Sequence, residues 1–481
     1  MIKVIKGLLS LLIVGSGITA SAQQDYTLYH MRYVPQSSFT NAAFTPEAKV
    51  YVGLPGLSGL YFSASNNGFK WSDLLRPEDT PGAEKALVVD APNALSKMKK
   101  LNLFSQEFRA DIINFGLKVG NNHFAFNIST REKFSIAYTR DMFGLLLIGN
   151  GLTAAESQAE YGTEDFGYLG GTADLSGTGV NFTQFQEIGI KYSRTFLDEK
   201  LSIGARPKIL LGSVNLQSKK TDLTLSTDEE TFALTTTGGM EINTSLPAAF
   251  TDSDGFGIGD LGFADNKGFG LDLGATYLIT EQIELSASIN DLGFIRWANN
   301  PKNYITDDFE ITFKGISGFE DELISGNNPE AGTDTVSSTL SEFADSLVST
   351  ITPDTTYEAY SAGIGANFNI GGRYAFTKRH SVAALLSGRM VARQFKPALS
   401  LSYNFRLYKW LGVTAAYNAY SRSYTNLGMG LSFNLFPVQF HIITDNIWAI
   451  SPATTRAFHA RFGINLVFGH DKGDMKEKRN F

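Results

Sequence analysis

The last regular segment of the chain alternates apolar and polar residues without a break. The apolar set is Phe458, Ala460, Phe462, Ile464, Leu466 and Phe468, and the residues between them are His459, Arg461, Gly463, Asn465 and Val467. Successive side chains of a β-strand point to opposite faces, so the pattern predicts a strand with two different faces. A strand of this length, with one face for lipid and one for a polar lumen, is typical of an outer-membrane barrel.

The N-terminus predicts export. Lys3 and Lys6 precede a short apolar stretch, and Ala20-Ser-Ala22 fits a cleavage site. Residues 1–22 therefore read as a signal peptide, with the mature chain beginning at Gln23. No other stretch approaches the ~20 apolar residues of a membrane helix, which excludes an α-helical membrane protein.

Composition narrows the class of protein. Charged residues make up 19% of the 481 residues, below the ~25% of soluble domains. Cysteine is absent, which removes disulfides, thiol catalysis and Cys-ligated metals. The net charge is −7, and it becomes −9 without the two signal-peptide lysines. This balance gives no reason to expect a nucleic-acid partner.

Further alternating segments follow one another through the second half of the chain. They are Phe269 to Ile279, Ile283 to Asn290, Tyr360 to Ile370, Val382 to Met390, Leu399 to Leu407, Leu411 to Ala419, Leu427 to Leu435 and Val438 to Ile442. Many are close to the ~9–11 residues that cross a bilayer at a tilt, whereas strands of soluble sandwiches average ~5–6.

The connections alternate as well. Every second one is tight: Leu197 to Lys200, Thr280 to Gln282, Thr377 to His380, Leu407 to Trp410 and Phe436-Pro437. Others are long, including Leu246 to Lys267 and Arg296 to Tyr357. Because bacterial barrels have short periplasmic turns and longer extracellular loops, we expect the tight turns in the periplasm and the long loops outside the cell.

The strand count follows from this ladder. Glu187 to Phe468 gives eleven strands, with Leu201 to Ser226 as one long strand that pairs above the membrane with Thr231 to Ser245. Three more, Phe108 to Val119, His123 to Thr130 and Lys133 to Thr139, make fourteen. Lys49 to Leu54 and Leu57 to Ser65 would make sixteen. We predict an all-β, antiparallel transmembrane barrel of about 14 strands, with 16 as the alternative.

The barrel domain is predicted over residues 23–470, with residues 23–56 as a candidate irregular N-terminal segment and 471–481 as a charged tail. Asn93 to Leu101 and Asp141 to Ile148 are expected to form helical turns between strands. The spacing of apolar residues from Leu340 to Ile351 predicts a short helix, either folded over the mouth or acting as a plug or partner helix. Arg461 to Phe468 has the form of a barrel-assembly signal, which places that signal ahead of the tail.

Several segments resemble a Bacteroidetes-type outer-membrane family of unknown function. They are Ser21-Ala-Gln23, Asn41-Ala-Ala-Phe44 with Pro46, Val50 to Pro55, Leu427 to Asn434, Pro437 to Phe440, Thr444-Asp-Asn446 and Arg461 to Gly469. More distantly, the early segment resembles PorP/SprF-type barrels of type IX secretion and gliding, although Ala42 stands here where those proteins carry proline. FadL-like fourteen-strand barrels are a structural analogy. The resemblance implies a barrel in the outer membrane and no established activity.

Two motifs in one Gly/Asp-rich segment suggest ligands. Gly257-Ile-Gly259-Asp-Leu-Gly262 matches a dinucleotide-phosphate pattern, but no βαβ unit surrounds it. Asp252, Asp254 and Asp260 fit part of a calcium-loop register, yet Phe263 stands where the bidentate glutamate belongs. A solvated acidic loop and a calcium site both remain open.

The six histidines show no zinc-type spacing, and no Gly-x-Ser-x-Gly elbow is present. His441 and His459 fall on the polar faces of the final strands, where a Ser/His/Asp-type set is the alternative. We expect no enzyme activity, no catalytic or metal-binding residues and no cofactor.

Charged residues recur on the inferred lumen face. They are Lys191, Arg206, Lys208, Asp272, Arg389, Arg406 and Arg461. These residues either form cross-strand ion pairs that fill the lumen or make a basic constriction that favours anions.

Two functions follow from a barrel in the cell outer membrane. The first is a transport channel for small or hydrophobic solutes, and the alternative is a structural or docking barrel of an envelope assembly. The expected partners are outer-membrane lipid, the barrel-assembly machinery through the C-terminal strand, and envelope proteins.

Overall fold

A computed structural model describes residues 25–78, 86–247, 266–313, 353–391, 394–408, 410–450 and 455–469. Fourteen antiparallel strands close into a barrel. In ring order they are β1 (Val50–Gly53) with β2 (Leu60–Asn66), β5 (Leu101–Val119), β6 (Asn122–Thr139), β8 (Gly179–Phe196), β9 (Leu201–Thr227), β11 (Asn266–Leu278), β12 (Ile283–Trp297), β15 (Tyr360–Gly363) with β16 (Asn367–Ala375), β17 (His380–Val391), β18 (Gln394–Tyr408), β19 (Leu411–Tyr420), β20 (Ser423–Leu435), β21 (Val438–Thr444) and β22 (Ala457–Phe468). The predicted fold class and the count of fourteen are confirmed.

The ring closes through the N-terminal strand. Both β1 and β2 lie between β22 and β5, with Tyr51 opposite Val467 and Tyr61 opposite Arg461. The two segments run in the same direction between the same two neighbours, so they form one strand. Pro55, which lies between them, interrupts that strand. The alternative of sixteen strands, which counted them separately, is therefore wrong.

A second correction concerns β6. His123 to Thr130 and Lys133 to Thr139 were expected as two strands, but they form one, paired with β5 along its length. The two residues between them, Arg131 and Glu132, continue the strand. Arg131 points into the barrel, where carboxylates of other strands neutralise it. One strand lost here and one gained at β1 and β2 leave the total unchanged.

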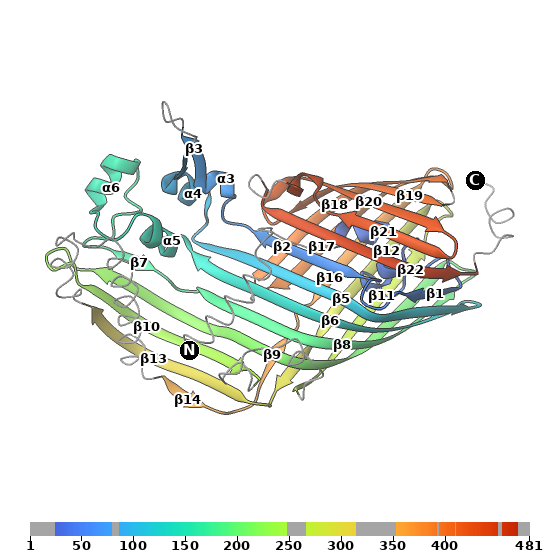
Figure 1. Cartoon of the computed structure of the whole chain (residues 1–481), viewed down its shortest axis with the longest axis horizontal. Coiled ribbons are helices and arrows are strands. Elements are labelled where there is room, and N and C mark those ends of the chain that lie inside the picture. The colour runs from blue at the N-terminus through green and yellow to red at the C-terminus, as the bar shows by residue number, and fades with distance from the viewer. Residues whose placement is uncertain are drawn as a thin grey trace.

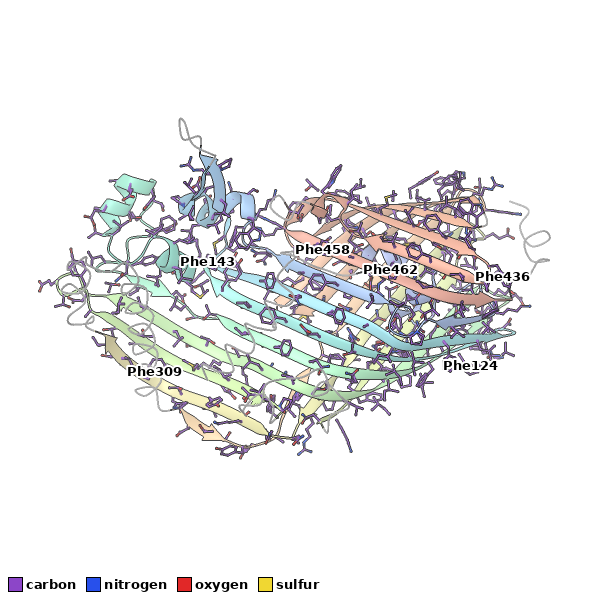
Figure 2. All side chains as sticks on the ribbon, in the orientation of Figure 1. Phe124, Phe143, Phe309, Phe436, Phe458 and Phe462 are labelled. Atoms are coloured by element: carbon purple, nitrogen blue, oxygen red, sulfur yellow. The ribbon has the colours of Figure 1, made fainter. Side chains whose placement is uncertain are left out.

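Six tight turns lie together at one end of the barrel, called here the inner end. They join β5 to β6, β8 to β9, β11 to β12, β16 to β17, β18 to β19 and β20 to β21. Phe124 and Phe436 mark this end in Figure 2, whereas Phe143 lies at the opposite, outer end. The alternation of tight and longer connections predicted from the sequence therefore holds around much of the ring. It fails at the outer end between β17 and β18 and between β19 and β20, where each connection is only two residues long.

The wall is taller on one side. Strand β9 continues past the barrel and pairs with β10 (Leu234–Ser245), which pairs with β13 (Pro301–Phe313) and then β14 (Asp354–Thr356). Figure 1 shows this sheet reaching beyond the red C-terminal strands. The pairing of the long strand with Thr231 to Ser245 was predicted. The strands β13 and β14 were not, since their residues were assigned to a loop.

Short elements form a cap at the outer end. They are α3 (Trp71–Leu74), β3 (Leu75–Glu78), β4 (Ala86–Val89), α4 (Ala91–Lys97), α5 (Arg140–Leu147), α6 (Ala154–Tyr161) and β7 (Thr172–Asp174). Phe69, Leu95, Tyr138 and Phe166 belong to its apolar core. The two predicted helical turns correspond to α4 and α5. The helix expected near Leu340, the glycine motif, the calcium-type register and the tail lie outside the described residues.

The wall strands have the two faces that period two requires. In β22, Arg461, Gly463 and Asn465 are buried within the barrel, whereas Phe468 is exposed on its outside. The outer faces of other strands also carry large apolar side chains such as Ile190 and Leu386, both more than half exposed. None of the helices in the described part of the chain is long and apolar enough to cross a membrane.

Candidate functional site

The lumen is entered by the chain's own N-terminal segment. Residues 25–48, called here the plug, begin at mid-height beside Arg461, reach the inner end at Arg32, return to mid-height at Phe39 and end at the inner end near Glu47. They include α2 (Tyr26–His30), the 3-10 helix η1 (Pro35–Phe39) and η1's connection to β1. The plug appears as the dark blue ribbon between the barrel strands in Figure 1. The plug lies within residues 23–56, which were predicted from the sequence as a candidate irregular N-terminal segment.

Apolar contacts fix the plug to the wall. Leu28, Met31 and Val34 form a buried cluster with Ile443 of β21. On the other side, the ring of Tyr26 packs against Tyr420 of β19, with ring centroids 5.1 Å apart. Burial of such side chains contributes ~1.5–3 kcal/mol each. The plug is therefore packed like a protein core and does not merely thread the lumen.

Glycines on the inner face of the wall make room for the plug. A Cβ at Gly428 would collide with the Thr27 hydroxyl, and one at Gly430 with the Met31 sulfur. On the opposite wall, a Cβ at Gly204 would collide with the backbone of Ala42. Glycine within a strand often marks such a close approach of another backbone. These positions explain the glycines of the Leu427 to Asn434 segment.

Polar groups of the wall hold the outer part of the plug. The Asp445 carboxylate accepts the backbone N–H groups of Tyr26 and Thr27, at 3.1 and 2.8 Å, and so satisfies the first turn of α2. Arg461 donates two hydrogen bonds to the Asp25 carboxylate, at 2.6 and 2.5 Å. His459 Nε2 also lies 3.1 Å from Asp25.

The lower part of the plug is held in the same way. Arg206 donates to the Ser38 hydroxyl at 3.1 Å, and Lys191 donates to the backbone oxygen of Phe44. At the inner end, both terminal nitrogens of Arg406 lie 2.6 Å from the Glu47 carboxylate. Strands around the ring form the hydrogen bonds that hold both halves of the plug, and none of these contacts is covalent.

A cluster of ion pairs lies beside the plug at mid-height, called here the central ion cluster. Its members are Glu107, Arg109, Asp111, Arg131, Lys133, Glu187, Arg206, Lys208, Asp272, Asp291 and Arg389. Arg131 is its centre, 2.7 Å from Asp291, 2.8 Å from Glu107 and 2.9 Å from Glu187. Lys208 lies 2.7 Å from both Asp272 and Asp291.

The central ion cluster bridges the barrel. Arg389 on β17 lies 2.7 Å from Glu107 on β5, a strand on the opposite side of the ring. Phe39 of the plug lies against the same cluster, with the Arg109 guanidinium 3.8 Å from its ring centroid and that of Arg206 4.5 Å. The cluster and the plug thus form one network in which buried positive and negative charges are paired. A charge that is removed from water needs such a partner. The lumen is closed at this height.

Above the cluster the lumen opens into a vestibule of about 860 Å³. Lys133, Asp291 and Arg389 line its floor, and Phe134, Phe185 and Met390 are among its apolar wall residues. This volume falls in the ~300–1,000 Å³ range of small-molecule sites. The vestibule therefore combines a charged floor with walls that carry both apolar and polar side chains, the latter including Asn181 and Asn215.

The lumen residues predicted from the sequence divide between the plug and the cluster. Lys191, Arg406 and Arg461 contact the plug, Lys208, Asp272 and Arg389 belong to the cluster, and Arg206 contacts both. Sequence reasoning missed four central members: Glu107, Arg131, Glu187 and Asp291. Period-two alternation of charge through Glu107, Arg109 and Asp111 was the available signal.

The final histidines do not assemble a nucleophile. His459 uses Nε2 on Asp25, and its Nδ1 accepts the backbone N–H of Asp445 at 3.2 Å. His441 lies buried beneath Gly463, where an added Cβ would strike its ring. The hydrogen bonds of His459 serve to position the plug.

Comparison with known protein families assigns the chain to a family. Residues 43–445 match a family described as a family of unknown function, DUF5723. The chain belongs to this family. The match spans the barrel from the lower plug to Asp445, and so includes the wall glycines that accommodate the plug. A search of curated proteins found no match.

Solved structures offer weaker likenesses. A TodX monoaromatic hydrocarbon channel, in its deltaS2 mutant, shares 11% identity, with 93% of this chain and 94% of that chain covered, at a TM-score of 0.38. A Pseudomonas aeruginosa FadL homologue shares 12%, with 90% and 94% covered, at 0.38. The translocator domain of the autotransporter NalP from Neisseria meningitidis shares 6%, with 94% and 99% covered, at 0.30. Because these TM-scores lie below 0.5, they assign neither a substrate nor a mechanism to this chain.

Proposed function

We propose that this protein is a transport channel of the cell outer membrane for small or hydrophobic solutes, closed in the observed state by its plug. The vestibule of about 860 Å³ is the observation that carries the proposal. Its mixed lining suits a solute that buries apolar surface and meets charged groups at one end. The apolar outer faces of the strands and the predicted signal peptide support the outer-membrane location.

Passage requires the plug to move. The contacts between plug and wall are hydrogen bonds, ion pairs and packing, so they break reversibly. A minor open state some kcal/mol above the closed one would conduct in brief openings. Solute binding in the vestibule shifts this equilibrium only if the solute binds the open state more tightly.

A docking barrel of an envelope assembly is the second candidate. The filled lumen favours it, because a barrel that only presents surfaces needs no path through its centre. The ordered cap at the outer end would then be the surface offered to a partner. For either function we also propose that Arg461 to Phe468 is recognised by the barrel-assembly machinery and that the strands contact outer-membrane lipid.

A reversible disulfide between the plug and the wall tests the transport proposal. Thr27 in the plug and Gly428 in the wall are in contact, so cysteines at both positions are within disulfide reach. In this cysteine-free chain no other thiol interferes. We expect the oxidised double variant to be silent in single-channel recordings and in solute-uptake assays with liposomes. Reduction should restore the activity.

Each single cysteine variant is the matched control, since the side chain added at Gly428 could itself disturb the plug. Full conductance in the oxidised double variant would rule out passage through the plug's position. Silence of the wild type, reduced and oxidised proteins alike, together with a stable partner co-purified from detergent-solubilised outer membranes, would favour docking.

A further inference from the structure

A second pocket lies at the inner end, at the seam between plug and wall. Its volume is about 430 Å³. The plug contributes Arg32, Tyr33 and Glu47 to its lining, whereas the barrel contributes Arg373 and Phe405. The pocket therefore exists only while the plug is seated.

Two of the pocket's arginines are already neutralised. Arg32 lies 2.6 Å from Glu284, and Arg406 lies 2.6 Å from Glu47. Each of these pairs joins the plug to a barrel strand. They account for two of the carboxylates at this end of the lumen.

Arg373 differs from both. Its Nε donates to the Ser381 hydroxyl at 3.2 Å, and among the described residues no carboxylate lies within 4.0 Å of it. It sits on the lumen face of β16, half-buried, and lines the pocket. Lys378 and Arg379 of the adjoining turn add positive charge, against which the pocket lining adds Glu281. The site therefore carries an excess of cationic donors.

We propose that this pocket binds a small soluble phosphate monoester, with the Arg373 guanidinium as its anchor. A guanidinium presents two parallel N–H donors that match a phosphate, and it remains charged at every relevant pH. The pocket is larger than the phosphate group alone, and the rings of Tyr33 and Phe405 offer a surface for the organic part of the ester. A lipid headgroup carries the same phosphate chemistry and is the other source to be distinguished.

Such a ligand would fasten the plug. It touches plug residues and wall residues together, so it binds the closed state and not the open one. Mass action then favours the closed state by a factor that rises with ligand concentration. This inference rests on the seating of the plug and not on the passage of any solute.

The experiment uses the full-length protein with Ser37→Cys as its single thiol. Ser37 lies in the plug and is 2% exposed, so a maleimide reaches it only when the plug opens. In detergent free of phospholipid, phenyl phosphate is the probe, with sodium chloride at equal ionic strength as the salt control. We expect labelling to slow about tenfold at about ten times the dissociation constant.

Two arginine variants give the comparison. With Arg373→Gln the protection by phenyl phosphate should disappear. With Arg422→Gln, which changes an arginine that donates to backbone oxygens at the outer end, it should remain. Arg373→Lys keeps the positive charge but loses the two parallel N–H donors of the guanidinium, so partial protection is expected. It also serves as the test if Arg373→Gln does not fold.

Equal protection in the wild type and in Arg373→Gln would overturn the site, as would equal slowing by sodium chloride. Protection in phosphatidylglycerol nanodiscs without any soluble phosphate would overturn the soluble ligand and assign the pocket to a lipid headgroup. Absence of protection by phenyl phosphate in the wild type would overturn the proposal outright.

Discussion

The inner and outer halves of the lumen are built on the same strands yet filled in opposite ways. Below the central ion cluster, Leu28 and Met31 of the plug pack into the wall, and Arg406 of the wall binds Glu47 of the plug. Above the cluster, the walls enclose about 860 Å³ of open space.

The two halves differ in what lies against their inner faces. Glycine at positions such as Gly428 lets the plug backbone approach the wall, whereas in the outer half large side chains such as Phe134 and glycines such as Gly293 both face the vestibule. A polar lumen face therefore does not by itself make an open pore. Whether a barrel of this kind conducts depends on how firmly the inner half holds its plug.

The largest effect is expected from breaking the central ion cluster. Arg131→Leu leaves Glu107, Glu187 and Asp291 buried with less positive charge beside them. Removing one partner of a buried pair costs about 3–5 kcal/mol. Unfolding by urea in detergent should show a loss of that order.

Lys219→Leu is the outer-half control for this prediction. Lys219 forms a half-exposed pair with Glu241, and such pairs contribute about 0–1 kcal/mol. If Arg131→Leu fails to fold, Arg389→Gln tests the same cluster more mildly. Equal losses for the cluster variant and for Lys219→Leu would contradict the contrast between the two halves.

A smaller effect is expected from crowding the plug. Gly430→Val places a branched side chain against Met31 and should cost about 1–3 kcal/mol by overpacking. Because the strain falls on the plug and not on the strand pairing, single-channel recordings should show more frequent openings.

Met429→Val is the control on the preceding residue, whose side chain is 40% exposed on the outside of the barrel. It should leave the openings unchanged. More frequent openings in the Met429 variant than in the Gly430 variant would mean that the wall, and not the plug, limits conduction.

The smallest effect on the stability of the protein is expected from two single cysteine substitutions whose labelling rates are compared. A single cysteine at Asn181, which lines the vestibule and is partly exposed, should react readily with a maleimide. A single cysteine at Ser37 should react much more slowly, since its reaction needs the plug to open. Similar rates at both positions would mean that the inner half is as open as the outer half.

Much of the barrel follows from the sequence, because a strand's faces are a local property. In β22, the alternation of His459 to Phe468 is enough to say which side chains share a face. The tight turns are local as well, since a two-residue connection such as Phe436-Pro437 forces its strands to be neighbours. The same reasoning placed Arg206 and Asp272 inward on adjacent strands, where they lie opposite each other.

The sequence alone misassigned elements whose identity depends on distant partners. The two N-terminal strand segments were counted separately because only their shared neighbours, β5 and β22, reveal that they are one strand. Strand β6 was counted as two strands, and the carboxylates that neutralise Arg131 in the middle of it come from β5, β8 and β12.

The tertiary structure also decided what the lumen contains. Residues 25–48 have no strong period, so nothing local says that they enter the barrel. Their position is set by contacts with residues hundreds of positions away, such as Thr27 with Asp445. Arg389 finds Glu107 across 282 residues of sequence, because closure of the ring brings opposite walls within the reach of two side chains. Sequence periodicity determined the wall, and ring closure determined the plug, the ion cluster and the vestibule.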